Sequence, residues 1–115
     1  MTATATLQRV DAETLYRKMT GEHSPIIINA LSQDAYVAKH IPGSINIQTE
    51  NAERAKEVIP YMDAEIIVYC ANADCDASPN LAQKLEEMGY TNVSDFEEGL
   101  AGWREAGYDL IGSEV

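Results

Sequence analysis

The 115-residue chain is short of cysteine, aromatic residues and positive charge. It has two cysteines, whereas a small secreted domain stapled by disulfides usually has more. Eight Lys and Arg stand against nineteen Asp and Glu, which gives a formal net charge of −11. Nucleic acid and anionic membranes are therefore not expected partners. No apolar stretch approaches the roughly 20 residues that a membrane span needs.

The N-terminal sequence MTATATLQRV lacks the basic region and apolar core of a secretory signal. We therefore expect a cytoplasmic protein, in which two cysteines are reactive or regulatory rather than a structural staple. Residues 1–8 are small and polar and are expected to be loose. With 45% hydrophobic residues, the chain is predicted to form a single globular domain over residues 1–115, monomeric by default.

Short β-branched runs alternate with helical patterns along the chain. Strands are expected at 26–28, 44–47, 66–70 and 92–95, and helices at 51–58, at 78–88, after Asp11, after Ser32 and through Leu100 to Gly107. Pro42 and Gly43 suit the central positions of a type II turn. This alternation predicts an α/β fold with a mainly parallel central sheet and helices on both faces.

The most informative stretch is the apolar run that ends at Cys70. Ile66 to Tyr69 form the expected buried strand, and a short loop follows the cysteine. Ser78 is expected to cap the next helix and Pro79 to be its first residue, and the Ser78 hydroxyl could also face the sulfur of Cys70. A thiol at the carboxyl end of a parallel strand is well placed for chemistry. The helix dipole and the loop N–H groups would favour its thiolate.

Three phrases of the sequence are distinctive: His40-Ile41-Pro42-Gly43-Ser44-Ile45-Asn46-Ile47, Val68-Tyr69-Cys70, and Gly99-Leu100-Ala101-Gly102-Trp103-Arg104-Glu105-Ala106-Gly107-Tyr108. In these phrases the chain resembles a single-domain rhodanese, a member of the sulfurtransferase family. The match covers nearly everything from Asp11 to Gly112. It implies the rhodanese fold and a persulfide carried on the loop cysteine, which here is Cys70.

The chain departs from the family pattern at the arginines. Active members often have Arg directly after the cysteine and again five positions after it, where this chain has Ala71 and Cys75. The family phrase Asp-x-Arg before the His-Ile-Pro-Gly turn is replaced by Asn29-Ala30-Leu31. The resemblance therefore implies a sulfur-carrying thiol that is poor with thiosulfate.

The active-site loop is predicted to consist of Ala71, Asn72, Ala73, Asp74, Cys75 and Asp76. Cys75 is either a small residue in the place of an arginine or a resolving thiol that closes a disulfide with Cys70. A loop wrapped around one thiol should point its side chains outward, against the second alternative. Asp74 and Asp76 are either solvated turn residues or groups that repel anionic donors and raise the pKa of Cys70. We expect no metal and no cofactor, since two cysteines without a nearby histidine make no zinc site.

Three functions remain open at this stage. The first is a sulfurtransferase or sulfane-sulfur carrier, with a small sulfane-sulfur donor and a thiol, cyanide or protein thiol as acceptor. The second is a thiol redox module in which Cys70 and Cys75 cycle as a disulfide. The third is a non-catalytic rhodanese fold used for binding. A cysteine phosphatase is set aside, because the loop has no arginine to hold phosphate bidentately.

Overall fold

Five parallel strands form one sheet in the computed structural model, which describes residues 8–115. Across the sheet their order is β1-β5-β4-β2-β3. The strands are β1 (Gln8–Arg9), β2 (Ile26–Asn29), β3 (Ile45–Asn46), β4 (Ile66–Tyr69) and β5 (Val93–Phe96). The helices are α1 (Ala12–Met19), α2 (Gln33–Ala38), the 3₁₀ helix η1 (Thr49–Arg54), α3 (Ala55–Val58), α4 (Ala77–Glu87) and α5 (Gly99–Glu105). The predicted α/β fold is confirmed.

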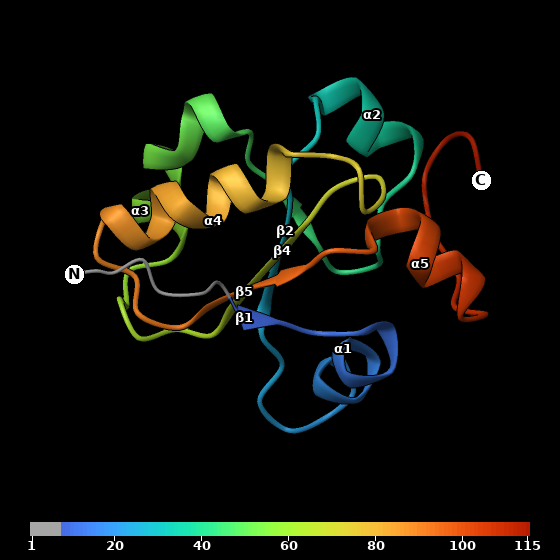
Figure 1. The fold of residues 1–115 in the computed structure, drawn as a ribbon, viewed down its shortest axis with the longest axis horizontal. Coiled ribbons are helices and arrows are strands. Elements are labelled where there is room, and N and C mark those ends of the chain that lie inside the picture. The colour runs from blue at the N-terminus through green and yellow to red at the C-terminus, as the bar shows by residue number, and fades with distance from the viewer. Residues whose placement is uncertain (1–7) are drawn as a thin grey trace.

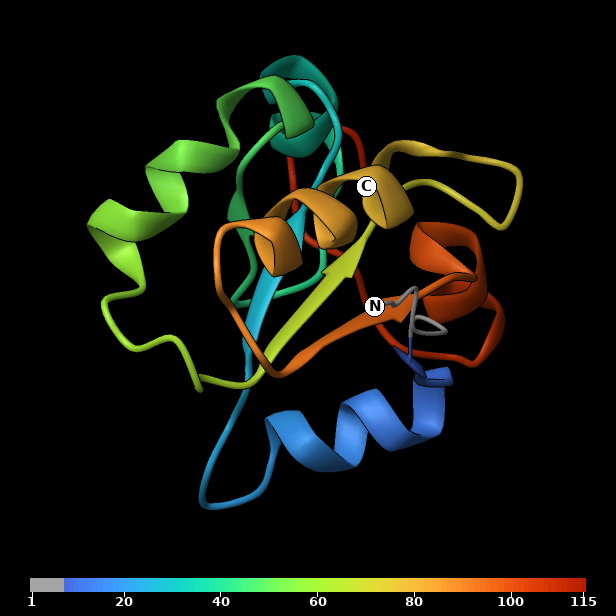
Figure 2. The same cartoon turned by 60° about the vertical axis from the view of Figure 1, so that its left-hand side comes forward.

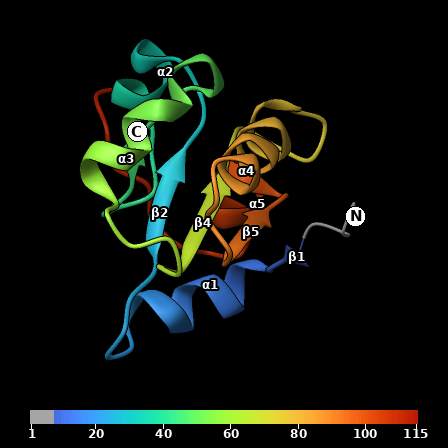
Figure 3. The same cartoon turned by 90° about the vertical axis from the view of Figure 1, so that its left-hand side faces the viewer.

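Helices cover both faces of the sheet, with α4 and α1 on opposite sides of the strands (Figure 1; Figure 3). Side chains alternate along β4, as strand geometry requires. Val68 packs with Leu81 and Leu85 of α4 on one face. Ile67 packs with Leu15 of α1 and Trp103 of α5 on the other. Both clusters are buried, and they fix the helices to the central strand that leads to Cys70.

The turn expected at Pro42 and Gly43 is present. The Ser44 N–H donates to the Ile41 carbonyl at 3.0 Å, and Gly43 has a φ of +87°. That positive φ is what a type II turn requires at its third position. The helix expected over 51–58 begins earlier, at Thr49, as the 3₁₀ helix η1 that continues into α3.

The loose N-terminal segment, expected over about residues 1–8, does not include Gln8. Gln8 belongs to β1 and is in parallel register with Ser94 of β5. Two residues are too few for a strand period to be visible in a sequence. Residues 1–7, also expected to be loose, lie outside the described residues. Within residues 8–115, no helix combines the length and the apolar character that a bilayer crossing requires.

Candidate active site

The loop after β4 begins at Cys70 and is held by the start of α5. The Leu100 N–H donates to the Cys70 carbonyl at 2.9 Å, and the Ala101 N–H donates to the Ala71 carbonyl at 3.0 Å. These N–H groups at the start of α5 are free to donate because helix geometry leaves them without partners inside the helix. Figure 2 shows the loop extending past the strand ends, close to α5. The first residues of the loop are thus fixed by backbone hydrogen bonds.

Gly99 permits this close approach of α5 to the loop. Its φ is +61°, and a Cβ built there would lie 2.1 Å from the Cys70 carbonyl oxygen. We expect Gly99→Ala to lower the free energy of unfolding by on the order of 2 kcal/mol. Urea denaturation checks the stability, and Gly107→Ala is a matched control, because Gly107 also has a positive φ but nothing lies near its Cβ position. Equal losses in both variants would mean that the contact with Cys70 contributes nothing.

The Cys70 thiol points inward, beneath the loop. Cys70 is fully buried. Its Sγ donates to the Cys75 carbonyl at 3.5 Å and lies 3.4 Å from the Ser78 hydroxyl. Burial raises the pKa of Cys70, the Cys75 side chain raises it further, and the Ser78 hydroxyl and N–H lower it. In contrast to the expected preference for the thiolate, these contacts together raise the pKa of Cys70, and burial is the largest cause.

The Cys75 side chain turns toward Cys70 instead of pointing outward, which corrects the second expectation. Burial raises the pKa of Cys75, but hydrogen bonds from the Cys70 thiol and from the N–H groups of Ala77 and Ala71 together lower it. Cys75 is also the more accessible of the two thiols. The pKa of Cys75 is thus lowered, whereas that of Cys70 is raised.

The rest of the loop forms a turn on the surface. The Asn72 carbonyl accepts from the Cys75 N–H at 3.1 Å, and the Asn72 Oδ1 accepts from the Asp74 N–H at 3.0 Å. Asn72, Ala73, Asp74 and Asp76 are exposed. These donors close the turn, so the loop does not present all its N–H groups to Cys70. Asp76 raises the pKa of Cys75.

Ser78 does not cap α4. The helix begins at Ala77, after an N-cap Asp76 that makes no side-chain cap hydrogen bond. Ser78 is therefore the second helical residue, and Pro79 is the third. The Ser78 side chain, 1% exposed, faces the sheet and the Cys70 thiol. The predicted alternative, a hydroxyl facing the thiol, is what the structure contains.

The His-Ile-Pro-Gly turn is fixed to the end of β4 by the Tyr69 hydroxyl. That hydroxyl accepts from the Asn29 amide at 3.0 Å and from the Ile41 N–H at 2.9 Å, and it lies 2.9 Å from the Ser44 hydroxyl. Asn29, which stands where the family phrase has Asp, thus anchors this network. Burial raises the pKa of Tyr69, so the hydroxyl stays protonated. These residues position the strand end without touching the thiol.

Asp95 is a buried group near the site that the sequence analysis did not single out. It lies on β5, is 2% exposed, and its Oδ1 has no hydrogen-bond partner among the described residues. Burial raises its pKa, and the Ser78 hydroxyl lowers it. The sequence did contain one indication of this group, a carboxylate at the end of the strand expected at 92–95.

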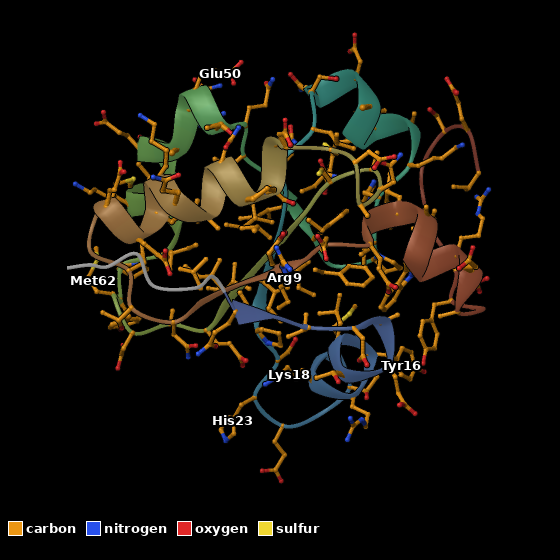
Figure 4. All side chains as sticks on the ribbon, viewed as in Figure 1. Arg9, Tyr16, Lys18, His23, Glu50 and Met62 are labelled. Carbon is orange, nitrogen blue, oxygen red and sulfur yellow. The ribbon has the colours of Figure 1, made fainter. Side chains whose placement is uncertain are left out.

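Among residues 8–115, neither histidine makes a hydrogen bond to the loop that follows β4. His23 follows α1 on the side of the molecule opposite α4 (Figure 4). The His40 ring stacks on Tyr36 and its Nδ1 lies 2.7 Å from the Tyr36 carbonyl oxygen. In the part of the chain that the structure describes, no three His, Cys, Asp or Glu side chains are arranged to hold a metal ion.

Comparisons with known proteins agree with this architecture. The chain is 34% identical over 97 residues to the HTH-type transcriptional regulator Rv0324 of Mycobacterium tuberculosis, matching 84% of this chain but 41% of that protein. The chain thus spans about two fifths of this relative. It is 29% identical over 89 residues to the thiosulfate sulfurtransferase GlpE of Shewanella oneidensis, which covers 77% of this chain and 85% of that protein.

A solved structure of similar fold is the rhodanese-like domain of the Alr3790 protein from Anabaena. It superimposes with a TM-score of 0.82 at 24% identity, over 95% of this chain and 82% of that one. The sequence model of the rhodanese-like domain matches residues 11–106, which include both cysteines, the turn at Gly43 and the glycine that admits the loop. The chain belongs to the rhodanese-like domain family.

Proposed function

We propose that this protein moves sulfane sulfur as a persulfide on Cys70. The observation that carries the proposal is the position of Cys70 at the carboxyl end of β4, in a loop held by α5, within a rhodanese-like domain. Similarity to a protein named a thiosulfate sulfurtransferase supports this class of chemistry. A deprotonated Cys70 attacks the outer sulfur of a donor, and the bond between the two donor sulfurs breaks. The donor leaves as a thiolate, and a thiol or cyanide later takes the sulfur from Cys70.

The charge of the loop favours donors other than thiosulfate. Asp74 and Asp76 flank Cys75, and residues 70–76 contain no Lys or Arg. A thiosulfate dianion would therefore approach two carboxylates without a compensating cation. An uncharged or singly charged organic persulfide or polysulfide suits the loop better. The acceptor is a small thiol, cyanide or the thiol of another protein.

The second candidate is a dithiol redox function, and the orientation of Cys75 favours it. The Cys70 thiol lies 3.5 Å from the Cys75 carbonyl, and each of the two thiols shifts the pKa of the other, so the two side chains are close together. If Cys70 carries a persulfide, the Cys75 thiolate can attack the sulfur attached to Cys70. A Cys70–Cys75 disulfide forms, hydrosulfide leaves, and an external dithiol must then reduce the disulfide.

Intact-mass measurements separate these functions. The protein is measured untreated, after an organic persulfide donor, and after mild oxidant. A gain of one sulfur that cyanide removes supports the carrier. Loss of two hydrogens with release of hydrosulfide supports the dithiol function. If neither mass change is seen, both functions are contradicted, and a non-catalytic binding domain is favoured.

We expect dilute peroxide to form an intramolecular Cys70–Cys75 disulfide that blocks sulfur uptake until a reductant is added. The two thiols lie close together, so little movement is needed to join them. Cys75 is oxidised first, because it is the more accessible thiol and its pKa is lowered. Non-reducing peptide mapping identifies the bond, and Cys75→Ser is the control. Sulfenic or sulfinic acid on one cysteine, with the other still free, would contradict this expectation.

A further inference from the structure

The buried carboxyl of Asp95 lies under the first turn of α4, next to the strand that ends at Cys70. In the parallel register Asp95 is opposite Val68, whose side chain packs against Leu81 of α4. The Asp95 side chain is therefore on the face of the sheet that α4 covers. Its Oδ1 has no hydrogen-bond partner among residues 8–115. An unpaired carboxylate oxygen in a protein interior is costly, and such a group calls for a reason.

Ser78 connects this carboxyl to the thiol. Its hydroxyl is buried and lies 3.4 Å from the Cys70 Sγ, and it is close enough to the Asp95 carboxyl to lower the pKa of that group. Thiol, hydroxyl and carboxyl thus follow one another from the loop into the protein. A hydroxyl can accept one proton while it donates another, so it can pass a proton along such a chain.

We propose that Asp95 receives the Cys70 proton through the Ser78 hydroxyl when Cys70 attacks a sulfane sulfur. The inference rests on the proposed sulfur transfer and supplies its proton acceptor. The S–H bond of Cys70 breaks as its proton moves to Ser78, and the Ser78 proton moves to Asp95. The thiolate then attacks the donor R–S–SH, giving Cys70–S–SH and R–S⁻. The proton held on Asp95 is returned to solvent, where the leaving thiolate takes it up.

This route explains how the thiol can react without a loop arginine. The thiol and the carboxylate together carry one negative charge before and after the proton moves. No additional cation is then needed to create the nucleophile. Asp95 and Ser78 are positioning residues, since neither touches the sulfur donor in this scheme.

The surroundings of Asp95 raise its pKa, as a proton acceptor requires. Burial raises its pKa above the usual range of a carboxyl, and Glu97, which follows β5, raises it further. Arg9 on β1, labelled in Figure 4, lowers the pKa of Asp95, but the Arg9 side chain is exposed and lies 3.7 Å from Glu97. A raised pKa makes the carboxylate a better proton acceptor. The rate of thiol reaction should therefore fall as pH decreases through the raised pKa of Asp95.

The test uses full-length Cys75→Ser, in which Cys70 is the only thiol. Two rates are measured against pH: alkylation by iodoacetamide, an uncharged reagent, and sulfur loading from an organic persulfide. Asp95→Asn should slow both about tenfold or more at neutral pH and remove the loss of rate on the acid side. Ser78→Ala should have a similar effect, and the double variant should be little slower than either single variant.

If Asp95 acted on Cys70 only through its charge, Asp95→Asn would speed the reaction of the thiol instead of slowing it. Removing a nearby negative charge lowers the pKa of a thiol and speeds its alkylation. An Asp95→Asn variant that reacts as fast as its parent, or faster, would therefore overturn the proposal. Glu97→Gln is the matched control, because it removes an equal charge without contact to Ser78. Its rates at neutral pH should stay within about twofold, and the loss of rate on the acid side should remain but move to lower pH.

Folding and function are separated within the same experiment. The ionised, buried Asp95 disfavours folding above its raised pKa, so Asp95→Asn should be at least as stable as its parent at neutral pH. If it fails to fold, Ser78→Ala decides the proposal alone. If the parent chain takes up no sulfur, the proposed function is contradicted, and the alkylation rates still decide whether Asp95 receives the proton.

Discussion

Replacing Cys70 by serine should abolish the uptake of sulfane sulfur, whereas Cys75→Ser should still load close to one sulfur per chain. Cys70 lies at the strand end, where its carbonyl accepts from the Leu100 N–H and the next carbonyl, that of Ala71, accepts from the Ala101 N–H. A serine there is similar in size but cannot form a persulfide. Cys75→Ser removes a neighbour that raises the pKa of Cys70, so loading should reach the same final extent and should not become slower. Intact mass and cyanide-releasable sulfur give the extent, and a time course gives the rate.

The outcome that would contradict this assignment is equal loading of the two variants. Loading only in Cys70→Ser would assign the sulfur to Cys75, the thiol with the lowered pKa. The unfolding transition of each variant is the control. A hydroxyl buried in place of the Cys70 thiol can destabilise the core, so a loss of sulfur uptake must be compared with the fraction of folded protein.

The central strands could be predicted from sequence because their residue types determine them locally. Ile26 to Ile28 and Ile66 to Tyr69 are β-branched or aromatic runs, and the interior positions of both are buried as expected. Gly43 marked its turn, since few other residues adopt a positive φ. The phrases that resemble rhodaneses lie on this framework. The fold could thus be predicted where local residue preferences and the alternation of strands and helices agree.

The interior of the loop could not be predicted in the same way. Whether Ser78 caps its helix depends on one turn of backbone, and the helix begins two residues earlier than a cap at Ser78 would place it. The direction of the Cys75 side chain depends on the turn closed by Asn72. The role of Asp95 depends on β5 lying beside β4. These three features depend on contacts between distant parts of the chain or on the conformation of one turn, and the periodicity of the sequence does not indicate either.

Cys75→Arg should raise thiosulfate:cyanide sulfurtransferase activity roughly ten- to a hundredfold, because one cation contact at a partly enclosed site is worth on the order of 1–3 kcal/mol. Cys75 is the loop residue whose side chain turns toward Cys70, so a guanidinium placed there can meet a dianion bound near that thiol. Arginine also removes the second thiol, so Cys75→Gln, long and uncharged, is the matched control. The gain should be specific to thiosulfate and should shrink at high salt, where charge attraction is screened. An organic persulfide of low charge should gain little. Efficient thiosulfate turnover by the wild-type protein, unchanged by Cys75→Arg, would mean that backbone N–H groups alone neutralise the donor and that the missing arginines do not determine donor choice.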